Sequence, residues 1–221
     1  MKPSVNTLPN YSKRDEIMNS ITHLIGFIFA LGVLTFFIVF NYVKHLKFSY
    51  MIPYYIYALS MMIVFGVSTL YHASKLKSKS KAVLRVIDHS DIYFFVFGTY
   101  LPLCLYAIGN HTVATIALIL ESVFMVAGIV LNVTPVDNKA MKLIAYIIYI
   151  IDGWLILFFY PFNIDMDFNV FLFILLGGIV YTIGAVLYGI GKKKIYFHSI
   201  FHIFVLLGAA TQFVGIYLLL T

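Results

Sequence analysis

Long apolar segments constrain this chain more than any other feature of its sequence. A helix needs about 20 mostly apolar residues to cross a bilayer, and segments of that length follow one another with only short polar breaks. Because a backbone in contact with lipid must satisfy its own hydrogen bonds, we expect these segments to be helices. The sequence therefore predicts an all-α membrane protein, a seven-transmembrane helix bundle whose spans cover roughly 20–43, 50–72, 84–108, 112–131, 141–160, 168–190 and 196–220.

The scarcity of charge agrees with this interpretation. Charged residues make up 11% of the 221 residues, whereas soluble domains carry about 25%. The only sizeable polar stretch is 1–16, which contains Pro3 and Pro9 and lacks apolar periodicity. We predict a flexible cytoplasmic tail over 1–16 and one transmembrane domain over 17–221. Cys104 is the only cysteine, so an intrachain disulfide is excluded.

Basic residues divide unequally between the two sides of the predicted bundle. Seven spans place the N-terminal tail and the loops after the second, fourth and sixth spans together, and that side carries 13 Lys and Arg residues against two, Lys44 and Lys47. Since basic loops are retained in the cytoplasm, we predict a multi-pass protein of the cell membrane with its N-terminus in the cytoplasm and its C-terminus outside. Basic loops facing an anionic leaflet also explain the net charge of +6, so no nucleic-acid partner is expected.

Five of the seven histidines fall near the cytoplasmic ends of their predicted helices: His23, His72, His89, His198 and His202. His198 and His202 are four residues apart, so they share one helix face and can grip a metal ion together. His72 is the natural third ligand, because catalytic zinc commonly takes three protein ligands and keeps one position for water. We predict a zinc site formed by these three residues. The alternative is that the pair only hydrogen-bonds to backbone or to lipid headgroups.

A serine and an aspartate share this membrane level. A carboxylate inside a membrane needs a cation, a metal or a metal-bound water, so Asp88 is predicted to support a ligating histidine or to act as general base. Its alternative is an ion pair with Arg85, one turn earlier. Ser68 lies one turn before His72 and is predicted to orient a water or a substrate carbonyl, unless it only bonds to its own helix. Three further acids lie within spans and receive no role: Asp91, Glu121 and Asp152.

Five short motifs, taken together, resemble those of a known family. They are EIMNSITHLIG at 16–26, STLYH at 68–72, DHS at 88–90, GTYLP at 98–102 and HSIFH at 198–202. Their order and spacing resemble the hemolysin III family, the bacterial branch of the progestin and adiponectin receptor family. The resemblance implies seven helices with a cytoplasmic N-terminus, and zinc held by His72, His198 and His202. It also implies that Asp88 and Ser68 match the family's helix-3 acid and helix-2 serine.

The resemblance leaves three functions open. Eukaryotic relatives look like lipid-amide hydrolases, which favours a zinc-dependent hydrolase acting on lipid amides or esters, with Asp88 and Ser68 as catalytic residues and membrane lipids as partners. In that mechanism zinc activates a water and polarises the carbonyl. Bacterial members carry the hemolysin name, which favours a membrane-lytic, pore-forming protein or a membrane-lipid homeostasis factor. The third hypothesis is a non-enzymatic sensor of membrane state with structural zinc. The oligomeric state is not predicted.

Overall fold

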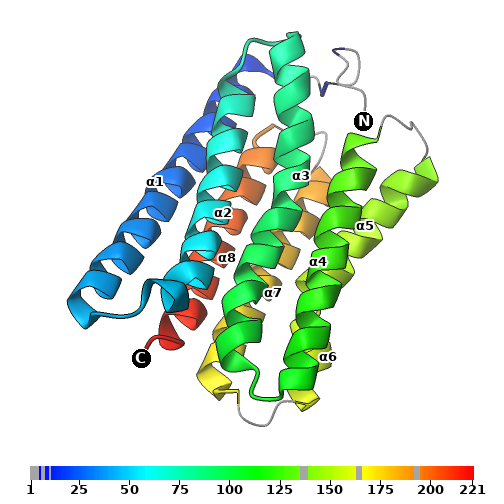
Figure 1. Cartoon of the computed structure of the whole chain (residues 1–221). Coiled ribbons are helices and arrows are strands. Elements are labelled where there is room, and N and C mark those ends of the chain that lie inside the picture. Colours follow the sequence, from blue (N-terminus) through cyan, green and yellow to red (C-terminus); the bar gives the residue numbers. More distant parts are fainter. Residues whose placement is uncertain (1–4, 6–7, 10, 135–138, 163–165, 192–194) are drawn as a thin grey trace.

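The protein is described by a computed structural model that covers residues 5, 8, 9, 11–134, 139–162, 166–191 and 195–221. Over these residues the chain forms helices and no strands, which confirms the all-α class. Figure 1 shows an elongated bundle in which α1 begins at one end and α8 finishes at the other. The elements are α1 Lys13–Lys44, α2 Phe48–Ala73, α3 Lys79–Pro102, η2 Leu103–Ala107, α4 His111–Val133, α5 Lys139–Gly153, α6 Ile156–Phe159, η3 Tyr160–Phe162, α7 Phe168–Gly191 and α8 Phe197–Leu218.

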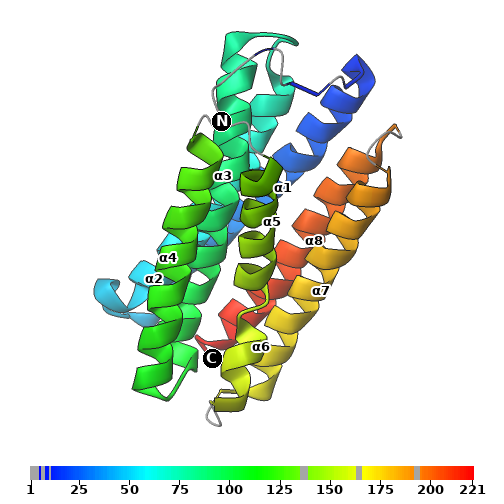
Figure 2. The ribbon, with the colours of Figure 1, turned by 90° about the vertical axis from the view of Figure 1, so that its right-hand side faces the viewer.

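Six helical segments of the described chain are long and apolar enough to cross a membrane: α1, α2, α3 with η2, α4, α7 and α8. The fifth predicted span is not one continuous helix. Its first part, α5, has 15 residues and is therefore about 22 Å long at 1.5 Å per residue. That is shorter than the hydrocarbon core of about 30 Å. The short elements α6 and η3 follow it, and together they run from the end of α4 to the start of α7 at opposite ends of the bundle (Figures 1 and 2).

Local sequence explains why α5 stops. Gly153 is a poor helix former, and Pro161 lacks the N–H that a continuing helix needs. A backbone N–H freed inside a membrane protein must find another acceptor. Tyr100 of α3 supplies it, because its hydroxyl accepts the N–H of Ile156 at 2.8 Å. The interruption is thus held by a side chain from a neighbouring helix.

Neighbouring helices approach closely where glycine replaces a side chain. A Cβ at Gly98 of α3 would collide with the hydroxyl of Ser60 on α2. A Cβ at Gly26 of α1 would collide with the ring of Phe65 on α2. Small residues of this kind let membrane helices pack backbone to backbone. They hold α1, α2 and α3 together, and the contact of Gly26 with Phe65 lies next to His23.

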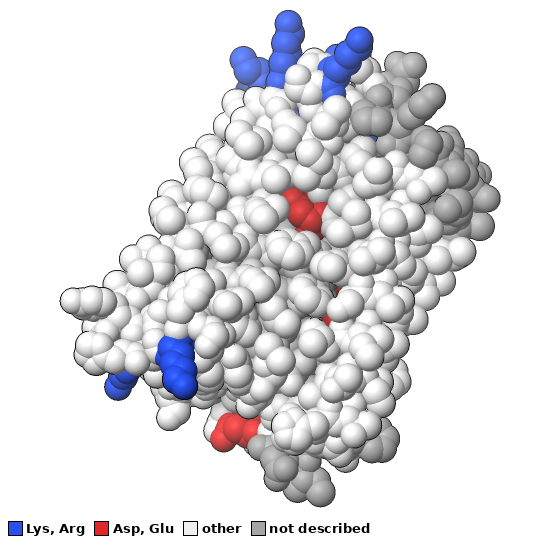
Figure 3. All heavy atoms as spheres, in the orientation of Figure 1, with Lys and Arg blue, Asp and Glu red and all other residues white. Residues whose placement is uncertain are grey.

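Lys and Arg side chains gather towards both ends of the bundle, and the band between them carries few charges on the face in view (Figure 3). Two cations that lie between the second and third predicted spans, Lys79 and Lys81, belong instead to α3, which begins at Lys79. Ser78 caps this helix, since its hydroxyl accepts the N–H of Lys81 at 3.1 Å. The earlier helix start places Lys81 inside the bundle, where its side chain is buried.

Two acids from different helices meet in the interior of the bundle. Glu121 of α4 is fully buried, Asp152 of α5 is 1% exposed, and their carboxyl groups interact with each other. All four carboxyl oxygens are buried without a hydrogen-bond donor among the described residues. Since an ionised carboxylate only accepts hydrogen bonds, the two groups can bond to each other only if one of them carries a proton.

We expect Glu121→Ala to lower the free energy of unfolding by about 1–3 kcal/mol, because Asp152 then stays buried without its partner. Glu121→Gln keeps a donor at the same place and should cost clearly less. Thermal unfolding of the purified protein in detergent measures both, with the exposed Val123→Ala on the same helix as control. Equal losses for the alanine and glutamine variants would show that the pair does not form this bond.

Candidate metal centre

Three histidines from two helices converge at the end of the bundle where α1 begins. His72 lies in the last turn of α2, and His198 and His202 lie in the first turns of α8. One ring nitrogen from each residue lies within 4.8 Å of the other two. The Nε2 atoms of His72 and His198 are 3.3 Å apart. Two zinc–nitrogen bonds of about 2.0–2.1 Å at a tetrahedral angle would separate their nitrogens by about 3.3–3.4 Å, so these two side chains are spaced as ligands of one metal ion.

The outer nitrogen of His72 is held by a carboxylate. Its Nδ1 lies 2.7 Å from Oε2 of Glu16, and both side chains are nearly inaccessible to solvent. A histidine that donates its Nδ1 hydrogen to a carboxylate keeps Nε2 free for a metal. Glu16 reaches this place because α1 begins early, at a capping box in which Ser12 and Asp15 bond to each other's backbone N–H.

His202 is oriented by a hydroxyl from the same helix as Glu16. Its Nδ1 lies 3.2 Å from Oγ1 of Thr22. Thr22 directs its own hydrogen to the carbonyls of Met18 and Asn19, at 3.0 and 2.9 Å, so its oxygen accepts the Nδ1 hydrogen of His202. The Nε2 atom of His202 is therefore free, as it is in His72. Two successive turns of α1 thus fix the tautomers of two histidines on two other helices.

A second link between α1 and α8 lies beside the cluster. The hydroxyl of Ser199 donates to Oδ1 of Asn19 at 2.6 Å, and both residues are buried. His23, one turn further along α1, packs its ring against His202 with 3.8 Å between the ring centroids. It is not one of the three converging histidines, and its Nδ1 is buried without a hydrogen-bond partner among the described residues. His23 therefore forms the inner wall of the cluster.

The predicted serine and aspartate also meet here. The side chains of Ser68 and Asp88 are hydrogen-bonded to each other, and the Asp88 carboxylate lies 3.3 Å from Nδ1 of the more exposed His89. The Asp88 carboxylate interacts electrostatically with His72. The structure thus brings the carboxylate and its hydroxyl donor to the side of the histidine cluster that α3 occupies.

Tyr11 covers the cluster from the end of the chain. Its ring stacks on His198 with 5.1 Å between centroids, and its hydroxyl lies 3.4 Å from that of Tyr188 on α7. Burial raises the pKa of the Tyr11 hydroxyl well above its ordinary value, so the group stays neutral. The described end of the chain before α1 therefore packs onto the cluster.

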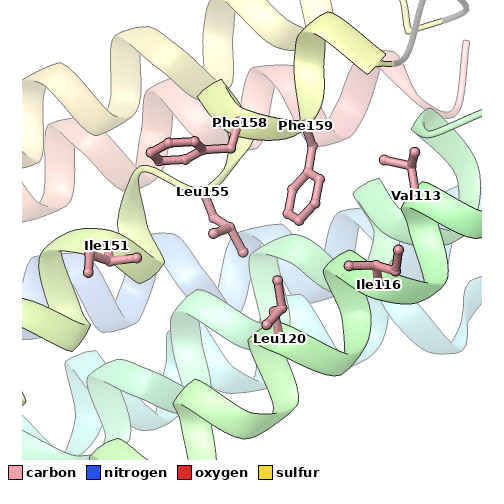
Figure 4. A pocket seen from close by; sticks show the side chains of 7 residues that line it. All are labelled: Val113, Ile116, Leu120, Ile151, Leu155, Phe158 and Phe159. Atoms are coloured by element: carbon pink, nitrogen blue, oxygen red, sulfur yellow. The ribbon is translucent and has the colours of Figure 1, made fainter.

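A cavity of the described chain lies away from this chemistry. It measures about 540 Å³ and opens between α4 and the interrupted segment α5–α6 (Figure 4). Its walls carry no ionisable group, so it offers no acid, base or ligand. The lining residues are Val113, Ile116, Leu120, Ile151, Leu155, Phe158 and Phe159.

Fold and site together define an all-helical, multi-pass membrane protein with a buried histidine cluster able to hold a metal ion. The chain belongs to the Haemolysin-III related family, whose model matches residues 11–213, and this confirms the resemblance seen in the motifs. It is 34% identical over 206 residues to the Hemolysin-3 homolog of Bacillus subtilis (strain 168), which covers 92% of this chain and 93% of that relative. It is 32% identical over 203 residues to Hemolysin-3 of Bacillus cereus, covering 90% and 89%.

Sequence reasoning missed three residues of the site. Glu16 was assigned to the tail and Lys81 to a loop, and Thr22 was given no role. The depth of Glu16 in the membrane could have revealed its role, because a buried acid one turn into the first helix must face a partner. Their contacts with the histidines follow only from helix rotation, which apolar length does not fix.

We expect His72→Ala to abolish metal binding, because two ligands from one helix cannot replace three from two. Metal content of the purified protein, measured by inductively coupled plasma mass spectrometry, tests this. His89→Ala is the matched control, since His89 is exposed and lies outside the cluster, and it should keep the full content. Retention of the metal by His72→Ala at wild-type stoichiometry would remove this residue from the ligand set.

Proposed function

We propose that the protein is a zinc-dependent hydrolase of lipid amides or esters, with its site in the inner half of the cell membrane. The observation that carries the proposal is the convergence of three imidazoles, two of them oriented by residues of α1, beside a hydrogen-bonded Asp88–Ser68 pair. Three histidines with a further position for water are the usual ligand set of catalytic zinc. A structural zinc site more often has four protein ligands.

Each residue has a distinct role in this proposal. His72, His198 and His202 hold the zinc ion. When bound, zinc supplies Lewis acidity that polarises the scissile carbonyl and activates water. Asp88 accepts the proton of the attacking water, and Ser68 orients the Asp88 carboxylate by donating to it. The apolar helix faces around the cluster suit the acyl chain of a membrane lipid, whose polar linkage then lies at the level of the histidines.

We further propose seven membrane crossings, with the histidine end of the bundle in the cytoplasm. The excess of Lys and Arg in the loops on that side supports this orientation. The segment α5–η3 counts as the fifth crossing, because it connects opposite ends of the bundle (Figure 2). Its short first helix is compatible with a crossing, since broken helices are tolerated where neighbouring helices satisfy the backbone.

In a Cys104→Ser background, we expect Lys77→Cys to be protected from a membrane-impermeant maleimide in intact cells and labelled after permeabilisation. Thr221→Cys should be labelled in intact cells, because the C-terminus then lies outside. Mass shift of the protein on a gel measures both, and the cysteine-free parent is the control. Labelling of the two positions on the same side of the membrane would contradict an odd number of crossings.

The hydrolase proposal makes a second prediction. We expect purified protein in liposomes to release fatty acid from amide- or ester-linked lipids, and we expect His198→Ala to lose both zinc and turnover. Asp88→Asn should keep zinc and lower turnover about 100- to 10,000-fold, the usual contribution of general acid–base catalysis. Fatty acid release is measured by mass spectrometry. Turnover that survives the loss of zinc would eliminate the mechanism.

Membrane lysis is the second candidate, favoured by the hemolysin names of the two relatives. Dye leakage from the same liposomes separates it from hydrolysis. Leakage by wild-type protein and by His198→Ala alike, without fatty acid release, would favour the lytic function. A protein that loses thermal stability on chelation, with neither leakage nor lipid turnover, would favour the structural-zinc sensor.

A further inference from the structure

Lys81 lies buried beside the metal centre. Lys81 is 1% exposed, whereas the nearby Lys75, Lys77 and Lys79 are exposed. Moving an ammonium group out of water costs several kcal/mol unless it is fully compensated. A lysine that is buried near the end of a helix, close to water, therefore needs specific partners.

The partners of the Lys81 ammonium all belong to the metal centre. Its Nζ forms an ion pair with Oε1 of Glu16 at 3.0 Å. It donates to the carbonyl of Tyr71 at 2.7 Å and to that of His72 at 3.4 Å. The ammonium group thus has two carbonyl acceptors and one carboxylate counter-charge around it. The ring of Tyr71 adds a cation–π contact at 4.6 Å.

These contacts fix His72 in two independent ways. The carbonyls of Tyr71 and His72 lie in the last turn of α2, where carbonyls lack the usual helical N–H partner and that of Tyr71 has only the capping N–H of Ser74 at 3.3 Å, so Lys81 holds the backbone that carries the ligand. Glu16 accepts from Nδ1 of His72 with one oxygen and meets Lys81 with the other. Lys81 therefore fixes the rotation of the carboxylate that in turn orients the imidazole.

We infer that Lys81 is a positioning residue of the metal centre and acts on the bound metal through Glu16 and His72. The inference rests on the metal site of the proposed function and is independent of which reaction the site performs. Outer partners of this type typically change metal affinity 10- to 100-fold when removed. The arrangement also links α1, α2 and α3 at one point, so the turn between α2 and α3 is mechanically connected to the metal ligands.

The test measures metal binding to the purified full-length protein. Zinc affinity is determined by competition with a chromophoric chelator, and ligand geometry by the visible absorption of the cobalt-substituted protein. We expect Lys81→Met to weaken zinc binding about 10- to 100-fold and to shift the cobalt spectrum. Lys79→Met, an exposed lysine on the same helix, should change neither.

A double substitution separates positioning from general stability. If Lys81 acts through Glu16, Glu16→Gln with Lys81→Met should weaken zinc binding by little more than Glu16→Gln alone, because residues in one network do not act additively. Fully multiplied effects in the double variant would overturn the inference that Lys81 acts on the metal through Glu16. So would a Lys81→Met variant that has a lower melting temperature but an unchanged zinc affinity and cobalt spectrum.

If the Lys81→Met variant does not fold, the Lys81→Arg variant is tested in its place. It keeps the charge, but a planar guanidinium cannot place one compact cation among the same three oxygens, so the cobalt spectrum should still shift. An unchanged spectrum and affinity would overturn the inference. Wild-type protein that binds no metal would overturn both this inference and the proposed function, whereas bound metal that is indifferent to Lys81 would overturn this inference alone.

Discussion

The carboxylate of Glu16 is the point on which the metal centre depends. It lies among apolar helices, where an ionised group is stable only with partners on its oxygens, and its two oxygens meet His72 and Lys81. These contacts join the beginnings of α1 and α3 to the end of α2. Asn19 and Thr22 continue the same face of α1 and bond to Ser199 and His202 of α8. The histidine cluster is thus assembled around one face of the first helix, which itself supplies none of the three converging nitrogens.

The need of backbone groups for hydrogen-bond partners shapes the opposite half of the bundle. The break after α5 frees backbone groups in an apolar interior, and the hydroxyl of Tyr100 accepts one of them. Glu121 and Asp152 lie next to the break and interact with each other, because no other described residue donates to their carboxyl groups. Both devices follow from the same constraint, because a polar group that cannot reach water must find its partner inside the protein. They also explain how a segment with only 15 residues in its first helix can remain part of a membrane bundle.

The site could be predicted from sequence only to a limited depth. The four-residue spacing of His198 and His202 implies a shared helix face, and topology placed His72 and Asp88 at the same level. The structure brings these residues together. Glu16 and Lys81 were misassigned because sequence patterns locate helix ends only within a few residues. An early start of α1 and α3 moved both residues from polar segments into the protein.

The sequence by itself determined the class of the protein. In a bilayer, runs of about 20 apolar residues must form helices to satisfy their backbone hydrogen bonds. The motifs of the histidine-bearing segments indicated the family. Tertiary structure decided the rest: the interruption after Gly153, the pairing of Glu121 with Asp152, and the Glu16–Lys81 contact behind His72. Apolar length fixes that a segment is helical, but it does not fix the helix's rotation or its neighbours. Those depend on side chains from several helices meeting at once, and no single stretch of sequence contains that information.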